Sequence, residues 1–360
     1  MKKTKNKANR TVQQPTPKST AVRLSTPNPP VAARERRSNR LVWLSGLCLL
    51  VVLAVGACYA LNNGLAAPTP TPLPATPTVA PPPTTVPLVV GPANACRRHP
   101  RFAPQLGFSV QAVLATNFTD IKGMGLLEPA TETAEARFYQ DPTWDDAGWL
   151  GHLTFDPQGN VYVFPAPRVS LVDNPPERQN TIYRVDTDSG MMTTFITLTA
   201  AAPPSPENPF GIMGMTYDCD TDSLYASTVS GSTRAQEVGK LVHINRTTRE
   251  IVGEYTGIDP YGIAIYNHPT GKRLYFGLAR TSEVYSLALD ATGAFVGDPQ
   301  LELTLPDPTF KAWRIAFDAD GALQVRGLEF DYNLIATSDN KEVAYTFRYD
   351  AATSTWQLSQ

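Results

Sequence analysis

The pattern of hydrophobic and polar positions divides the chain into four segments. From Cys96 onward, short apolar stretches alternate with polar turns rich in Gly, Asp, Asn and Pro, which is typical of an all-β domain. Residues 41–61 form one uncharged, mostly apolar run of 21 residues, and residues 62–95 contain ten prolines, six threonines and no charge. The pattern therefore predicts a polar tail (1–40), an apolar helix (41–61), a linker (62–95) and a β domain (96–360).

The β domain contains a repeat that is made of two half-units and occurs four times. Each half-unit is an apolar strand, a polar turn and a second strand. The first half-unit begins at Leu153, Met215, Ile263 and Ile315, and the second follows each time at Thr181, Lys240, Glu283 and Val343. An Asp or Asn opens every turn, where its side chain can accept hydrogen bonds from backbone amides two residues on. These residues are Asp156, Asp218, Asn267 and Asp318 in the first half-unit and Asp186, Asn245, Asp290 and Asp350 in the second.

Each copy of the repeat supplies two hairpins, and equivalent turns recur at spacings of 62, 49 and 51 residues. Repeated sets of four antiparallel strands are typical of the blades of a β-propeller. Residues 102–148, with the strand patterns SVQAVLATNF and EARFYQ, are long enough for one further blade. The sequence therefore predicts five blades of four strands.

The sequence PYGIA at residues 260–264 resembles the phrase that opens the innermost strand in NHL-repeat and gluconolactonase-like β-propellers. NPFGI at residues 208–212 is similar. The resemblance covers residues 150–360 and implies the architecture; six blades are usual among these relatives, so six is the alternative to five. We also expect an N-terminal strand to close the ring, because a propeller joins its first and last blades to remove open sheet edges.

The apolar run at 41–61 has the length of a single membrane-spanning helix, roughly 31 Å at about 1.5 Å per residue. Four arginines between residues 34 and 40 precede it, whereas the next positive charge after it is Arg97. The positive-inside rule then places the N-terminus in the cytoplasm and the β domain outside the cell membrane. A cleaved signal peptide, or lipidation of Cys58 in a lipobox-like sequence, is the alternative to an uncleaved signal anchor.

Charge is distributed unevenly along the chain. Residues 1–40 carry eleven Lys or Arg and one acidic residue, a net charge of +10, whereas residues 41–360 carry 20 basic and 32 acidic residues, a net charge of −12. The acidic domain argues against nucleic acid binding, and the basic tail is expected to set the topology and to attract anionic lipid. The uncharged Pro/Thr-rich linker predicts an extended stalk between membrane and domain.

The long connections between the expected strands all belong to one face of the propeller, where function is expected. They are residues 165–180, 199–210, 229–239, 256–261, 306–312 and 327–341. The segments that lead into the innermost strands on this long-loop face supply the candidate ligand-binding residues Asp145, Asp146, Trp149, His152, Asp259, Tyr261, Trp313 and Arg314. Carboxylates suit a hard cation such as Ca²⁺, and aromatic side chains suit an organic group. The alternative is that the acids only cap turns and the aromatic rings only plug the axis.

We expect this face to bind a protein, a glycan or a small molecule. The alternative is a cation-dependent hydrolase or lactonase, because the resemblance to gluconolactonase-like propellers implies a central metal held by Glu, Asn and Asp. That ligand set has no residue-by-residue match in this sequence. There is no Gly-x-Ser-x-Gly motif, and of the four histidines His152 is the one placed to act. Whether the protein is an enzyme stays open at this point.

The four cysteines fall into two pairs. Cys48 and Cys58 lie in the apolar run, and Cys96 and Cys219 lie in the β domain. Outside the cytoplasm the second pair is expected to form a disulfide, with two separate buried thiols as the alternative. Because Cys219 lies in a turn between the first two strands of its blade, the disulfide would bring the start of the domain to the face of short turns, opposite the long-loop face.

Overall fold

The computed structural model of the chain describes residues 88–359, except 119, 133, 167–172, 203–204, 206 and 334–340. The basic tail, the apolar run and nearly all of the linker lie outside the described residues, so the membrane span and the stalk stay predictions. Within the described ranges, no helix is long and apolar enough to cross a membrane.

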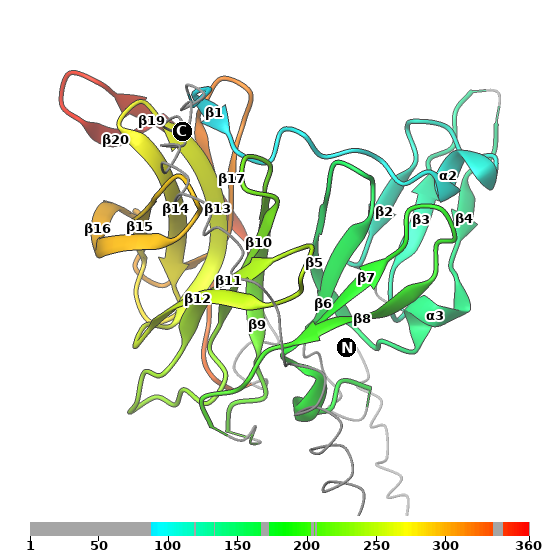
Figure 1. Cartoon of the computed structure of the whole chain (residues 1–360), viewed down its shortest axis with the longest axis horizontal. Helices are drawn as coiled ribbons and strands as arrows, with labels where there is room; N and C mark the ends of the chain where they lie inside the picture. The colour runs from blue at the N-terminus through cyan, green and yellow to red at the C-terminus, as the bar shows by residue number, and fades with distance from the viewer. Residues whose placement is uncertain are drawn as a thin grey trace, which may run out of the picture. The chain divides into compact units, whose positions relative to one another are not determined.

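The described residues form an all-β propeller of five blades (Figure 1). The first blade has three strands, β2 (Val113–Ala115), β3 (Gly125–Glu128) and β4 (Arg137–Tyr139). The second contains β5 (Leu150–Phe155), β6 (Val161–Pro165), β7 (Thr181–Val185) and β8 (Met192–Thr197). The third contains β9 (Ile212–Asp218), β10 (Ser223–Thr228), β11 (Lys240–Asn245) and β12 (Ile251–Thr256).

The fourth blade contains β13 (Pro260–His268), β14 (Gly271–Leu278), β15 (Glu283–Leu289) and β16 (Phe295–Thr304), and the fifth contains β17 (Lys311–Phe317), β18 (Leu323–Leu328), β19 (Val343–Asp350) and β20 (Thr355–Leu358). Three short helices, α2 (Phe102–Gln105), α3 (Pro142–Asp145) and η1 (Pro176–Arg178), lie in connections. The eight predicted hairpins are confirmed, and the order of strands within each blade follows the chain. The first blade agrees with the expected position, although β3 carries no alternating pattern that predicted it.

The predicted turn chemistry is confirmed in seven of the eight turns. The carboxylate or amide oxygen of the opening residue accepts from backbone amides two to four residues on, as Asp156 does from Gln158 and Asn160 at 2.9 Å. Asp218, Asp318, Asp186, Asn245, Asp290 and Asp350 make the same kind of contact. Asn267 is the exception, because β13 continues through it to His268, and its side chain donates instead to Asp220 at 2.9 Å.

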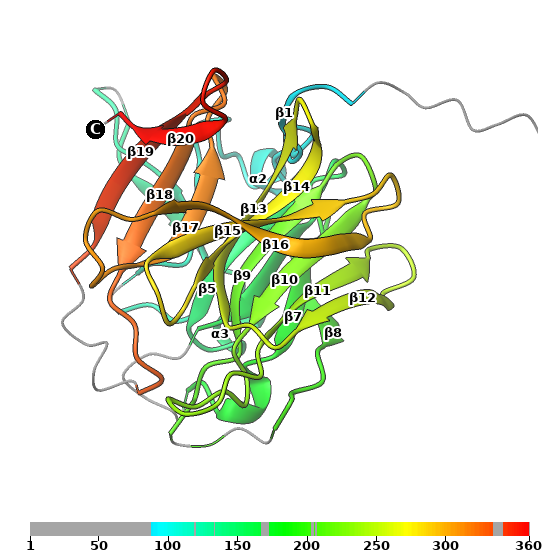
Figure 2. The same ribbon diagram turned by 90° about the vertical axis from the view of Figure 1, so that its left-hand side faces the viewer.

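Four apolar cores hold neighbouring blades together face to face. They contain, in order around the ring, Trp144 with Val161, Tyr162 with Tyr217, Tyr225 with Leu274, and Tyr275 with Trp356. Figure 2 shows the β13–β16 sheet between the sheets of the third and fifth blades. No such core among the described residues joins the fifth blade to the first. On the face of the first blade that points away from its core, Val113 and Phe138 are 56% and 45% exposed.

The expectation that an N-terminal strand closes the ring is wrong. The strand β1 (Gly91–Pro92) pairs with Asn267 and Tyr266 at the end of β13, in the fourth blade. The fifth blade takes all four of its strands from the C-terminal part of the chain, and β20 pairs with β19. Among the described residues, the seam between the fifth and first blades therefore has neither a shared sheet nor a shared apolar core.

The segment after β1 is fastened to the face of short turns by a disulfide between Cys96 and Cys219, whose Cα atoms are 5.9 Å apart. This distance is within the usual range of about 4.4–6.8 Å. The Cys219 amide also donates to the Ala93 carbonyl at 2.8 Å. The pairing expected from the sequence is therefore present, and the start of the domain lies where that pairing requires.

Candidate functional site

The four innermost strands, β5, β9, β13 and β17, each contain one extra residue relative to the strand beside them. In β17, Ala312 and Arg314 face the consecutive residues Gly327 and Arg326, so that Trp313 has no partner. The equivalent irregularities lie at 150–153, 212–214 and 260–263. A β-bulge bends a strand and redirects a side chain. In this register Gly151, Met213, Tyr261 and Trp313 occupy equivalent positions, and so do the residues that follow them, His152, Gly214, Gly262 and Arg314.

These residues line a cavity of about 770 Å³ that follows the axis of the propeller, which we call the axial cavity. All five blades contribute to its wall, because Thr116 and Asn117 follow β2, and the four innermost strands supply most of the rest. Gln324, Arg326 and Leu328 of β18 also line it, although β18 is the second strand of its blade. The cavity therefore extends from the axis into the unsealed seam between the fifth and first blades.

Glycines at the start of the innermost strands let neighbouring blades approach closely around the cavity. A Cβ atom on Gly262 would lie 2.5 Å from the Trp313 carbonyl oxygen, and one on Gly214 would lie 2.7 Å from the Tyr261 carbonyl oxygen. Real Cβ atoms do not approach backbone so closely. The glycine in the PYGIA phrase is thus explained by packing between blades.

Aromatic side chains form the wall of the cavity at the long-loop face. Phe330 packs between Phe210 and Tyr261, with ring centroids 5.0 Å from each. Tyr332 continues this cluster at 5.2 Å from Phe330. Burial raises the pKa of the Tyr261 hydroxyl above its ordinary value. The positive charge of the nearby Arg314 acts in the opposite direction and lowers this pKa, but its effect is the smaller one. This end of the cavity is therefore mostly apolar.

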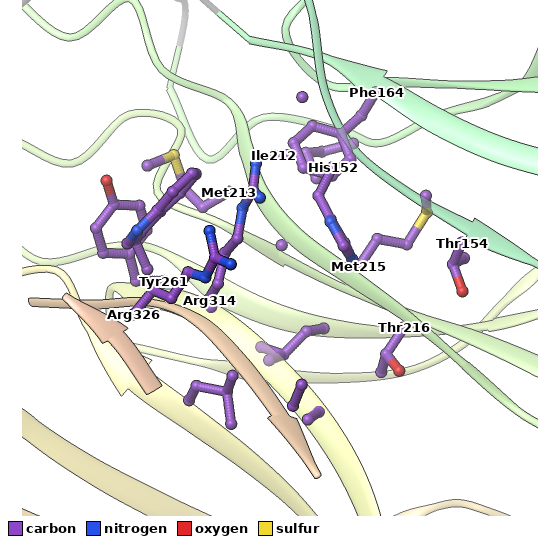
Figure 3. A pocket seen from close by; sticks show the side chains of 18 of the residues that line it. His152, Thr154, Phe164, Ile212, Met213, Met215, Thr216, Tyr261, Arg314 and Arg326 are labelled. Atoms are coloured by element: carbon purple, nitrogen blue, oxygen red, sulfur yellow. The ribbon is translucent and has the colours of Figure 1, made fainter. Parts of the chain in front are cut away.

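Two arginines of the fifth blade stand directly opposite each other on the wall of the cavity. Arg314 of β17 and Arg326 of β18 are Cα partners in the antiparallel ladder, so their side chains share one face of the sheet. Arg326 is paired with Glu342 at 2.9 Å, whereas Arg314 makes no ion pair or hydrogen bond with any described residue. Its guanidinium instead lies 4.0 Å above the Trp313 ring. Figure 3 shows both arginines beside each other, with His152 across from them.

His152 lies in a cationic part of the cavity. The residue lines the axial cavity and keeps exposed surface, and the desolvation by the surrounding protein together with the charges of Arg314 and Arg97 lowers its pKa to about 4. Arg97 follows the disulfide-bonded Cys96 and reaches the cavity from the face of short turns, where its Nε donates to the Asn94 carbonyl at 2.9 Å. Burial also lowers the pKa of Arg314, though not enough to discharge a guanidinium. At neutral pH the cavity therefore contains three arginine cations and a neutral imidazole.

The structure brings together five of the eight candidate residues: Trp149, His152, Tyr261, Trp313 and Arg314 all line the axial cavity. The placement of Asp145 and Asp146 around the axis is wrong. Both are exposed at the C-terminal end of α3, because the α3 turn buries Trp144 and directs the two acids outward. Asp145 lines a separate shallow hollow with Asp120 and Lys122.

Asp259 does not line the cavity either, and its placement there is also wrong. It is fully buried and holds the long loops together. Its carboxylate accepts from the Gly239 amide at 3.0 Å, from Arg280 Nε at 2.9 Å, and from the hydroxyls of Ser232 and Tyr332. Every strong acceptor direction of the carboxylate is occupied by protein, so Asp259 positions loops and is unavailable to a ligand.

The described residues offer no obvious cation site. None of the described residues that line the axial cavity is Asp or Glu, and nowhere in the described ranges do three His, Cys, Asp or Glu side chains gather to hold a metal ion. The carboxylates that suggested Ca²⁺ are those of Asp145, Asp146 and Asp259, which lie elsewhere. The chemistry of the cavity wall is that of hydrogen-bond donors, cations and aromatic rings.

Sequence reasoning missed several residues of the cavity. Arg97, Met213, Phe210, Phe330 and Arg326 line it and were not candidates. The only sequence signal for Arg326 is its position in a strand that pairs with β17, which becomes informative once the register is known. Arg97 carries no signal of its own, because the disulfide and β1 bring it to the axis.

Comparisons with known proteins concern the fold alone. No family model and no curated protein matches the chain. Among solved structures, a GH43 β-1,3-galactosidase with galactodeoxynojirimycin is 8% identical over 70% of this chain and 91% of its own, with a TM-score of 0.42. A luciferin-regenerating enzyme is 12% identical over 69% of this chain and 73% of its own, with a TM-score of 0.38. Hydrazine synthase of Kuenenia stuttgartiensis is 10% identical over 69% and 80%, with a TM-score of 0.40. These neighbours are β-propeller proteins, and none of the three is named as an NHL-repeat or gluconolactonase protein.

Proposed function

We propose that this protein is a membrane-anchored, extracytoplasmic β-propeller that binds a small organic molecule in its axial cavity. The observation that carries the proposal is the cavity itself, about 770 Å³ in volume and lined by seven aromatic side chains from four blades. Cavities of roughly 300–1,000 Å³ with apolar walls and a few polar groups are typical binding sites for small molecules. A propeller whose axis had only to be stable would fill this space with side chains.

The shape of the site favours one of the three expected ligand classes. A protein partner would need an extended surface, whereas the candidate residues that meet here line the inside of a cavity. A small molecule, or the terminal unit of a glycan, fits such a space. The hydrolase or lactonase alternative needs oxygen ligands or an acid beside the reacting group, and the described cavity wall supplies no carboxylate for either.

The location rests on the sequence. The uncharged run at 41–61, the four arginines before it and the Pro/Thr-rich residues 62–95 support a tethered domain held away from the membrane. The disulfide supports the same location, because disulfides persist outside the cytoplasm. Because the start of the domain lies at the face of short turns, the linker would join the propeller on that side. The long-loop face would then point away from the membrane.

Filling the cavity tests the binding function. Ala316 of β17 lines the cavity with exposed surface, so Ala316→Phe would occupy the space without changing the backbone. Ala351→Phe, at an exposed position in the β19–β20 turn, is the matched control. With the full chain in mild detergent, ligand-detected NMR against naphthyl and monosaccharide compounds should show binders for the wild type and the control that Ala316→Phe loses. Equal binding by all three proteins would contradict the axial cavity as the site.

A further inference from the structure

The charge of the axial cavity contrasts with that of the protein around it. Residues 41–360 carry a net charge of −12, yet the described cavity wall contains Arg97, Arg314 and Arg326 and no acidic residue. Chance placement in an acidic domain would bring carboxylates to the wall along with the arginines. The concentration of positive charge on the cavity wall is therefore a distinct feature of this site.

The arrangement of two of these arginines is unfavourable by itself. Like charges directly opposite each other across two strands destabilise a sheet, and Arg314 faces Arg326 in this way. Glu342 neutralises Arg326 at 2.9 Å, but no described side chain pairs with Arg314. Arg314 is therefore a partly buried cation without a direct ion pair, and the nearest influence of opposite charge is Glu342, which is already paired with Arg326.

Two buried donors at this point also lack acceptors. Arg314 Nε and Trp313 Nε1 are both shielded from solvent and have no hydrogen-bond partner among the described residues. Unsatisfied buried donors are rare in folded proteins, and each costs free energy. Both belong to adjacent residues at the β17 bulge, which marks this bulge as the point of the wall where donors exceed acceptors.

We propose that the axial cavity binds a small organic anion, with its negatively charged group at Arg314 and its apolar body against the aromatic wall of Phe210, Tyr261 and Phe330. This inference rests on the proposed function and specifies the class of ligand. Arg314 supplies the charge and Arg326 a second cation beside it. A carboxylate, a sulfonate and a phosphate ester share the required chemistry.

Matched naphthalene derivatives separate charge from shape. Naphthoate, the uncharged naphthamide and naphthylmethylammonium share one ring system, and naphthyl phosphate distinguishes a phosphate preference from a carboxylate preference. We expect the full chain in mild detergent, titrated in a calorimeter, to bind naphthoate at least tenfold more tightly than naphthamide and the ammonium compound most weakly.

Arg314→Gln should remove the preference for the anion, lowering the affinity for naphthoate at least tenfold and that for naphthamide much less, so that the two affinities converge and the remaining naphthamide binding reports that the variant is folded. Arg348→Gln is the control, because Arg348 lies exposed on the same sheet and does not line the cavity. Equal affinities for naphthoate and naphthamide in the wild type, or a preference that persists in Arg314→Gln, would overturn the anion assignment and leave the proposed function standing. Failure of every naphthyl compound to bind at millimolar concentration would overturn both.

Discussion

Removal of the disulfide between Cys96 and Cys219 should destabilise the propeller by several kcal/mol. The two residues are 123 positions apart, so the bridge closes a loop that contains almost half of the β domain. In the chain-entropy model, a loop of that length restricts the unfolded chain by about 5 kcal/mol, and loss of native disulfides usually costs about 2–5 kcal/mol. The native contacts around the bridge, the Cys219–Ala93 hydrogen bond and the pairing of β1, remain possible without it.

The perturbation is the double variant Cys96→Ser/Cys219→Ser in the full chain, compared with Cys48→Ser/Cys58→Ser as the control. An entropy of unfolding of about 2.1 cal/mol/K per residue over the β domain converts a loss of about 5 kcal/mol into a fall in Tm of roughly 5–10 °C. Differential scanning calorimetry without reductant should show this fall for the first variant and none for the control. Reductant should lower the Tm of the wild type to that of the first variant.

The same variant also tests the link between the disulfide and the cavity. Arg97 follows Cys96 directly and reaches the axial cavity because the bridge fixes this segment. The freed segment should weaken naphthoate binding, and naphthamide binding should change less. An unchanged Tm in the bridge variant would refute the reasoning, since it would mean that β1 and its contacts alone restrict the segment as fully as the covalent bond does.

Three further results are expected. Gly262→Ala should lower the free energy of unfolding by about 1–3 kcal/mol in urea titrations, because its Cβ would meet the Trp313 carbonyl oxygen at 2.5 Å. Gly253→Ala, whose Cβ has its nearest neighbour at 3.6 Å, should have little effect. Equal losses in the two variants would contradict the packing role of Gly262. His152 has a pKa of about 4 in the free protein, and a bound anion should raise this pKa. The affinity for naphthalene sulfonate should therefore rise by about tenfold as the pH falls from about 7 to 4, after allowance for solvent in the cavity. His152→Gln should abolish this rise. Protease added to intact cells should degrade the 96–360 domain and spare an N-terminal tag, and loss of the tag with an intact domain would reverse the predicted topology.

The architecture was predictable because it depends on local, repeated features. The turn-opening residues such as Asp156 and Asp350 act through atoms two to four positions away, so their role is visible in the sequence. The alternation of apolar residues likewise fixes which strands form hairpins. Closure of the ring was not predictable in this way, because it depends on where the N-terminal segment finds a free strand edge, and a two-residue pairing such as Gly91 with Asn267 carries no sequence pattern.

The sequence predicted the position of a site residue correctly only where that residue stands at the start of an innermost strand. His152, Tyr261 and Trp313 stand at the start of innermost strands, so their convergence follows from the propeller itself. Asp259 also stands at the start of an innermost strand, directly before β13. Its carboxylate nevertheless points away from the cavity, because it accepts hydrogen bonds from Arg280 and from two loop hydroxyls that are distant in the sequence. Sequence position alone does not distinguish these two outcomes.

The bulges explain how one repeated scaffold acquires a specific site. A bulge adds a residue to a strand that keeps its ladder with the next strand, so each innermost strand brings a pair of residues at equivalent positions to the cavity wall. These pairs are Gly151 with His152, Met213 with Gly214, Tyr261 with Gly262, and Trp313 with Arg314. The scaffold repeats, whereas the chemistry at its centre does not, which is the relation expected when function is added to a fold rather than determined by it.

The acidic charge of the surrounding domain has a consequence for how such a cavity selects its ligand. Beyond a Debye length of about 8 Å at physiological ionic strength, exposed acidic side chains are screened and neither attract nor repel an anion strongly. Inside the cavity the screening is weaker, and Arg97, Arg314 and Arg326 act at short range on whatever enters. Selection therefore depends on contact with the arginines and on the fit of an apolar body against the aromatic wall. An inorganic anion, which has no such body, should bind more weakly than an organic anion of the same charge.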